Sequence, residues 1–339
     1  MKYNFSLSII ITIIILIISS TSCFGQTING LDLFDLYLKN NLEYKRLNKK
    51  YELNKLEIEI EYYSNIAENN KIDKLRYKVA LLENEYQFEK MKYQKFKEIF
   101  NIYSSYILAQ ADLDILIGKK KYEAAILKEL KKKYREGMVL KRDLDIQNNK
   151  LQSIKNNIDH LQKKIKFLKN RLDQSLILQD ENYDYILNDK RQNFIGRIID
   201  NRNLIDFSRQ ILINKNKILK LEVKRSQIYN TPVKVEIKIK QKRKLLNDAL
   251  KINEKNKEQI EEEYKLIKEE FENSLNLITI KINEAKQDYK ILKKEFELGL
   301  NTEKHLIKNK NNISLLNLDR KRIILDYYKN QINYKIKML

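Results

Sequence analysis

Apolar residues recur at alternating steps of three and four positions over long stretches of this chain. One such stretch comprises Leu151, Ile154, Ile158, Leu161, Ile165, Leu168 and Leu172, and a second runs from Ile260 to Phe296. An apolar stripe of this period has to be buried against another helix. The 339 residues include only six Gly and one Pro, which leaves few positions at which the chain can reverse. We therefore predict an all-α fold built from a handful of very long helices.

Composition argues against a catalytic protein. A single Cys excludes a disulfide framework and a cysteine-rich zinc site, and the only two His, His160 and His305, stand far apart in the sequence. The chain has no Gly-rich phosphate loop and no G-x-S-x-G motif. Its carboxylates mostly alternate with Lys at helical spacing, which is typical of solvated helix faces. We expect no enzyme activity, no cofactor and no metal site.

The chain is strongly basic, with a formal net charge of +21. A basic chain can bind nucleic acid or an anionic membrane. Here the basic residues are mostly Lys, they are spread over the whole length, and they are interleaved with Glu. This distribution favours solvated helix faces, and we expect no nucleic-acid partner.

The segment from Met1 to Gly25 has the three parts of a secretory signal peptide. Lys2 supplies a positive charge, Ile9 to Ile18 form an apolar run, and small or polar residues lead to Gly25. The apolar run is too short for an ordinary membrane span. Two processing routes stay open, namely cleavage after Gly25 and lipidation of Cys23 as a new amino terminus. In either case we expect an exported protein of the outer membrane or the periplasm.

Two Gly residues interrupt the apolar stripes in the same way. Gly137 follows Tyr134 by three positions, and Gly299 follows Phe296 by three positions. Gly after a helix is a favoured left-handed cap. We therefore predict two helical hairpins, residues 82–136 with 138–178 and residues 241–298 with 301–338.

The segments in front of the two hairpins also correspond. Residues 31–65 and 195–230 both read as a short helix, a polar break and a second helix. A nearly constant offset between equivalent features indicates internal duplication. We therefore divide the chain into a signal peptide at 1–25, a first repeat at 26–178 and a second repeat at 179–339.

This plan resembles the TolC-like outer membrane efflux proteins, a duplicated family of long helical hairpins. Their hairpins turn at a Y-x-x-G-x-x-x-x-x-D-x-L-like motif. The first repeat matches it through Tyr134, Gly137, Asp143 and Leu144. The second repeat matches it through Phe296, Gly299 and Leu306, but His305 stands in place of the acid.

The resemblance implies a homotrimer whose helices form a passive tunnel for an efflux or type I secretion system. A periplasmic adaptor protein and an inner-membrane transporter would be its partners. The hairpin tips would be a gate or an adaptor-docking surface, and they comprise Gly137, Met138, Val139, Leu140 and Asp143 in one hairpin and Gly299, Leu300, Asn301 and Thr302 in the other. From the residues alone, the alternative is that each tip is merely a helix turn that needs Gly.

The sequence departs from the family in its supply of membrane strands. Residues 233–240 alternate apolar and charged side chains and are predicted to be a strand, and residues 71–82 offer a weaker candidate. We expect at most one or two short strands, so the barrel strands of the family are reduced or missing. The leading hypothesis is an export conduit. The alternative is a degenerate envelope scaffold or adaptor-binding coiled coil without a pore.

Overall fold

The computed structural model describes residues 27–30, 32–64, 70–178, 183–187, 207–228 and 232–339. The predicted signal peptide, with Cys23 and Gly25, lies outside these residues. The elements in chain order are β1 (Thr27–Asn29), α2 (Asp32–Asn40), α3 (Leu42–Ser64), α4 (Lys71–Arg135), α5 (Lys141–Leu176), β2 (Asp184–Ile186), α7 (Phe207–Ile228), α8 (Val233–Glu297) and α9 (Glu303–Met338). The prediction of an all-α fold with long helical hairpins and very short strands is confirmed.

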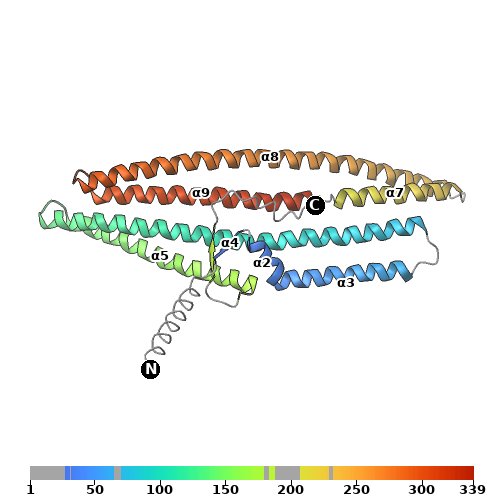
Figure 1. Cartoon of the computed structure of the whole chain (residues 1–339), viewed down its shortest axis with the longest axis horizontal. Coiled ribbons are helices and arrows are strands. Elements are labelled where there is room, and N and C mark those ends of the chain that lie inside the picture. The colour runs from blue at the N-terminus through green and yellow to red at the C-terminus, as the bar shows by residue number, and fades with distance from the viewer. Residues whose placement is uncertain (1–26, 31, 65–69, 179–182, 188–206, 229–231) are drawn as a thin grey trace, which may run out of the picture.

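The helices lie side by side in four rows along one axis (Figure 1). The short helices α3 and α5 share one edge row, α4 forms the next, α9 and α7 share the third, and α8 forms the other edge. Helices α4 and α8 have 65 residues each. At about 1.5 Å per residue each is about 100 Å long. The molecule is therefore a rod, with α3 and α8 on opposite edges.

The two hairpins match in length and in spacing along the chain. Helix α4 starts at Lys71 and α8 at Val233, and α5 starts at Lys141 and α9 at Glu303, so the sequence numbers differ by 162 in both pairs. Helices α5 and α9 have 36 residues each. The same offset thus relates equivalent positions in the two hairpins.

One part of the core lies near the middle of the rod, where the start of the first repeat meets the start of the second (Figure 1). The strands β1 and β2 pair in parallel there, with Ile28 opposite Tyr185. The largest fully buried side chains include Tyr37, Phe96, Phe100, Tyr103 and Tyr185. The buried hydroxyls have partners: Tyr185 donates to Asp173 Oδ1 at 2.7 Å and Tyr103 donates to the Ile186 carbonyl oxygen at 2.6 Å. An aromatic core of this kind holds the short helices to α4.

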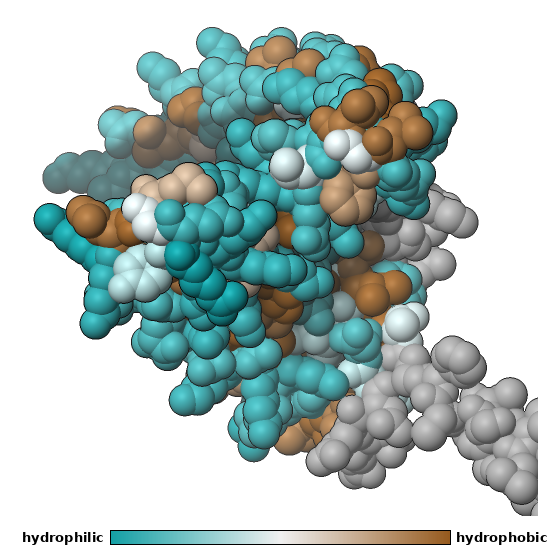
Figure 2. Space-filling model, turned by 90° about the vertical axis from the view of Figure 1, so that its left-hand side faces the viewer, coloured by the Kyte–Doolittle hydropathy of each residue, from teal (hydrophilic) through white to brown (hydrophobic). Residues whose placement is uncertain are grey.

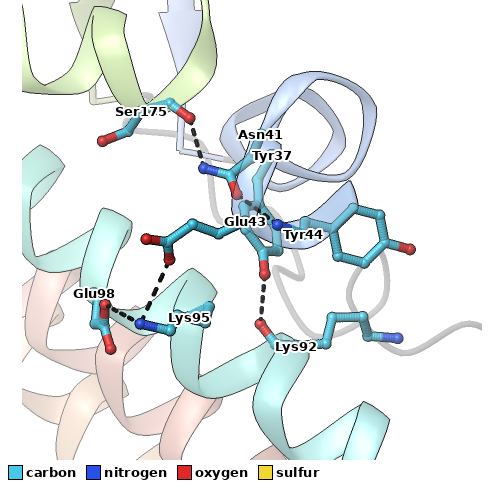
Figure 3. A network of polar contacts seen from close by, with 8 residues as sticks. All are labelled: Tyr37, Asn41, Glu43, Tyr44, Lys92, Lys95, Glu98 and Ser175. Atoms are coloured by element: carbon cyan, nitrogen blue, oxygen red, sulfur yellow. Dashed lines mark hydrogen bonds and ion pairs between the residues drawn. The ribbon is translucent and has the colours of Figure 1, made fainter. Parts of the chain in front are cut away.

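The break between α2 and α3 is fixed by Asn41, which is buried (Figure 3). Its Oδ1 accepts from the Tyr44 amide at 2.8 Å, which caps the start of α3, and its Nδ2 donates to the Ser175 carbonyl oxygen at 2.7 Å. The Tyr37 hydroxyl donates to the Lys92 carbonyl oxygen at 3.1 Å. The Asn41 side chain thus caps α3 and ties it to the end of α5.

Both strand predictions are wrong, because residues 71–82 and 233–240 are the first turns of α4 and α8. The helices consequently begin at Lys71 and Val233, before the predicted starts at 82 and 241. The Asn70 side chain caps α4 by accepting from the Ile72 amide at 3.0 Å. In α8 the Val235 amide donates to the Pro232 carbonyl oxygen at 2.8 Å, and Glu236 pairs with Lys240 at 3.0 Å. Alternation over a few residues is too short to override these local helix-forming contacts.

Candidate functional site

The two predicted tips are turns at the same end of the rod, on the left of Figure 1. In the first turn the Gly137 amide donates to the Tyr134 carbonyl oxygen at 3.0 Å, and the Met138 amide donates to that of Lys133 at 2.9 Å. Gly299 and Leu300 repeat these two bonds to Phe296 and Glu295, at 2.9 and 2.8 Å. Both turns are therefore Schellman motifs, which satisfy the last carbonyl groups of α4 and α8.

Both turns need Gly for a conformational reason. Gly137 has φ +71° and Gly299 has φ +73°. Both values lie in the left-handed region, which is unfavourable for residues that carry a Cβ. A Cβ added at either position would meet nothing within 4 Å. The Gly requirement is thus a property of the backbone, and the surrounding space is open for a partner.

The helices that return from the turns begin differently. Asp143 accepts from the Leu140 amide through Oδ2 at 3.1 Å and so caps α5. In the second hairpin the Thr302 amide is capped instead by Asn301 Oδ1 at 2.8 Å. His305, which occupies the position of Asp143, lies beside Thr302 and Asn301. The second turn therefore replaces a carboxylate cap by a cluster of Asn, Thr and His side chains.

Large apolar side chains are exposed at both turns. The exposed fractions are 65% for Met138, 72% for Leu140, 72% for Leu298 and 76% for Leu300. Val139 is half-buried. Figure 2 looks onto this end and shows apolar groups on two separate projections. Full burial of each of these side chains would stabilise a complex by about 1.5–3 kcal/mol. The tips are therefore a candidate docking surface.

A groove separates the end of α4 from the start of α9. It is lined by Leu127, Lys128, Lys131 and Arg135 on one side and by Thr302 and Lys304 on the other. The second turn thus lies beside the end of α4, and the groove lining carries five basic side chains and two acidic ones, Glu129 and Glu303. A partner that reaches both turns would meet apolar side chains at the ends and a net positive charge between them.

A buried polar cluster lies below the first turn, between α4 and α5. Glu123 is 3% exposed and Gln147 is 7% exposed. Gln147 Nε2 donates to Glu123 Oε2 at 2.8 Å and to the Glu123 carbonyl oxygen at 2.9 Å, and Lys150 Nζ lies 2.8 Å from Glu123 Oε1. Burial acts to raise the pKa of Glu123, but the hydrogen bonds from Lys150 and Gln147 outweigh it and lower that pKa.

Sequence reasoning missed this cluster, although the sequence holds an indication of it. Glu123 stands four positions before Leu127 on the apolar stripe of α4, and Gln147 stands four positions before Leu151 on the stripe of α5. Polar residues at equivalent stripe positions of two paired helices are expected to meet. The cluster fixes the register of the first hairpin a few helical turns below its tip.

No protein-family description matches the sequence, and no curated protein matches it. Solved structures do match its fold. The outer membrane channel CmeC of Campylobacter jejuni superposes with a TM-score of 0.59 and 12% identity, over 91% of this chain and 84% of that one. CusC, whose structures concern folding and transmembrane channel formation, superposes with a TM-score of 0.59 and 8% identity over 91% of both chains. The outer-membrane channel OprN superposes with a TM-score of 0.59 and 8% identity over 90% of both chains.

These likenesses establish the fold. The resemblance to TolC-like proteins is confirmed at that level, since the matched structures are outer membrane channels and cover most of the chain. Among the helices in the described parts of the chain, none combines the length and apolar character needed to cross a bilayer.

Proposed function

We propose that this chain is the passive conduit of an efflux or type I secretion system in the outer membrane or periplasm. The observation that carries the proposal is the pair of matched turns at one end of a rod about 100 Å long, both with exposed apolar side chains. The likeness to outer membrane channels supports it. The signal peptide would export the chain, which is then either cleaved after Gly25 or anchored through Cys23.

The exposed side chains on the edge helices of the molecule support association with further copies. On edge helix α8 the exposed side chains Leu245, Ile252, Leu266 and Ile280 recur at multiples of seven positions, with exposed fractions between 54% and 68%. An apolar stripe of this period needs a partner helix. A stripe of this kind on an edge helix becomes buried when several copies close into a ring. The resemblance to TolC-like proteins favours a ring of three copies.

The tips would contact the adaptor, and the inner-membrane transporter would supply the energy. An adaptor with apolar side chains and acidic groups would fit Met138, Leu140, Leu298 and Leu300 together with the basic groove. Opening would consist of a rearrangement of the hairpins, driven by the docked partners.

Conductance of the purified protein in planar lipid bilayers tests the proposal. We expect discrete channel events from an assembly whose native mass is that of three chains. Leu140→Glu with Leu300→Glu places carboxylates at the tips and is expected to raise cation selectivity, because the tips would line the mouth of the conduit. Leu42→Glu is a matched control, since Leu42 is 56% exposed but lies far from the tips, and it should leave selectivity unchanged.

Two results would contradict the proposal. A monomer that gives no conductance would favour an envelope scaffold without a pore, the second hypothesis from the sequence. Channels whose selectivity responds equally to the tip and control variants would show that the tips do not line the mouth.

A further inference from the structure

A second groove runs over α9, at the place where this helix lies between α4 and α8 (Figure 1). Residues 94–101 of α4 and 260–267 of α8 contribute its two walls, and residues 330–337 of α9 contribute its floor. Its volume is about 660 Å³, which is in the usual range for sites that bind small molecules. The groove does not include either turn.

Four carboxamide side chains line this groove. Gln94 and Asn101 belong to the α4 wall, and Asn330 and Asn333 belong to the floor. Within the described residues, none of these four side chains has a hydrogen bond to another protein group. Each carboxamide offers two donor hydrogens and an acceptor oxygen, so a ligand would meet several neutral hydrogen-bonding groups at once. We call this site the amide groove.

An aromatic pair belongs to the same lining. The rings of Tyr264 on α8 and Tyr334 on α9 stack with their centroids 4.2 Å apart. The Tyr264 hydroxyl is held in place, because Gln331 Nε2 donates to it at 3.4 Å and the Tyr327 hydroxyl lies 3.4 Å from it. A fixed pair of amphipathic rings lets the apolar face of a ligand pack without a cost for ordering the side chains.

The amide groove is neutral, although the chain carries a net charge of +21. Its lining contains two Lys and two Glu. Glu263 pairs with Lys337 at 2.9 Å, and Glu98 pairs with Lys95 at 3.2 Å. Apart from the tyrosines, the apolar part of the lining is limited to three Ile, which is little surface for a lipid chain. The composition therefore favours a neutral ligand that is rich in hydrogen-bonding groups.

Comparison of the two repeats shows that this polar lining is particular to the second one. With the offset of 162, Asn330 and Tyr334 correspond to Leu168 and Leu172 of α5. These two Leu side chains are 7% and 0% exposed and belong to the core. The fold that both repeats share thus accepts buried Leu at these positions, and it does not by itself require the amide and the phenol.

We infer that the amide groove binds a neutral oligosaccharide. A sugar offers hydroxyl groups to the carboxamides and the apolar face of its ring to the tyrosine pair. For an exported protein this ligand chemistry has two sources, namely the acetamido sugars of the cell-wall glycan and a saccharide that passes through the conduit. Binding of the sugar does not depend on whether the chain forms a conduit.

Isothermal titration calorimetry of the full chain with two trisaccharides tests the inference. Triacetylchitotriose carries acetamido groups and represents the cell-wall glycan, whereas maltotriose carries hydroxyl groups alone and represents an exported saccharide. We expect saturable binding of at least one of them. A preference for triacetylchitotriose would assign the groove to the cell wall, and a preference for maltotriose would assign it to exported cargo. Absence of binding by both would overturn the inference and leave the proposed conduit standing.

Substitutions test whether the sugar occupies this groove. Asn101→Ala should weaken binding about two- to tenfold, because it removes one hydrogen-bonding carboxamide. Asn157→Ala is the matched control, since Asn157 is also exposed within a helix but lies on α5 and does not line the groove, and it should leave the affinity unchanged.

A double variant tests the floor. Asn330→Leu with Tyr334→Leu gives α9 the residues of the first repeat and should weaken binding at least about tenfold, while the helical circular dichroism stays that of the wild type. Unchanged affinity in this variant would overturn the inference. So would an Asn157→Ala effect as large as that of Asn101→Ala, a comparison that holds even if the double variant does not fold.

Discussion

Lys150 Nζ lies 2.8 Å from Oε1 of Glu123, a carboxylate that is almost fully buried between α4 and α5. Lys150 itself is half-exposed, with 51% of its side chain in contact with solvent. The pair therefore combines a desolvated acid with a base that water still reaches. Gln147 supplies the remaining hydrogen bond, so the acid is satisfied only while both α5 residues stay in register.

Removing Lys150 should destabilise the first hairpin. Lys150→Ala leaves the buried carboxylate with Gln147 alone, and we expect the free energy of unfolding to fall by about 1–3 kcal/mol. Lys155→Ala, on the exposed face of the same helix, is the control and should change it by less than about 0.5 kcal/mol. Urea unfolding followed by helical circular dichroism measures both. Equal effects of the two variants would show that the pair contributes nothing to stability.

The stability of the protein should depend on pH through Glu123. Its pKa is lowered in the folded state, since hydrogen bonds from Lys150 and Gln147 outweigh the cost of burial. A lowered folded pKa contributes stability above the unfolded value, which is about 4.3 for Glu, and this contribution is lost as pH falls through the folded pKa. The wild type should therefore exceed Glu123→Gln in stability at neutral pH, and the difference in the free energy of unfolding should narrow as the pH falls below about 4.3. A gap that stays constant would contradict the assigned cause.

The turns could be predicted from the sequence because their determinants are local. A left-handed cap requires Gly at one position, and the stripes on both sides fix where the helices end. The starts of α4 and α8 could not be predicted in this way. Residues 233–240 alternate apolar and charged side chains, yet Val235 and Ile239 also stand four positions apart on one helix face, where they line a pocket with Ile72 of α4. The contact with this distant neighbour favours the helix together with the local caps, and the alternating pattern does not reveal it.

Sequence reasoning missed the strands β1 and β2 and the cluster at Glu123 for a related reason, because both depend on partners that are distant in the chain. Strand pairing joins Ile28 to Tyr185, far away in the chain, and strands this short carry no periodic pattern. Glu123 reads as one more acid in a chain that is 33% charged. Its burial becomes visible only when Gln147 is known to face it across the hairpin.

Replacing either turn Gly should destabilise the protein through the backbone alone. Gly137→Ala and Gly299→Ala force a Cβ into the left-handed region, which costs about 1–2 kcal/mol, and no neighbour adds a clash. Gly30→Ala is a suitable control, because its Cβ would make ordinary contact with Tyr103 at 3.5 Å. Thermal unfolding of the three variants measures the difference. A Gly30→Ala variant as unstable as the other two would refute the conformational explanation.

The two caps at the turns should respond differently to truncation. Asp143→Ala removes the acceptor of the Leu140 amide and should cost about 1 kcal/mol. His305→Ala should cost less than about 0.5 kcal/mol, because Asn301 already caps the Thr302 amide and the imidazole is exposed. Denaturant unfolding of both variants at one protein concentration gives the comparison. If His305→Ala proved the more damaging, the asymmetry between the turns would be misassigned.

Gly118 of α4 packs against Asn311 of α9, and a double variant can test this contact. A Cβ at Gly118 would lie 2.1 Å from Oδ1 and 3.0 Å from Cγ of Asn311, so Gly118→Ala should destabilise the protein unless Asn311 moves. In an Asn311→Ala background this obstacle is gone, and the same substitution should stabilise by about 0.5–1 kcal/mol, because Ala favours a helix interior over Gly. The sign of the Gly118→Ala effect should thus reverse between the two backgrounds in urea unfolding. An unchanged sign would mean that Asn311 rotates away freely, and that α4 and α9 can accept a side chain at this contact.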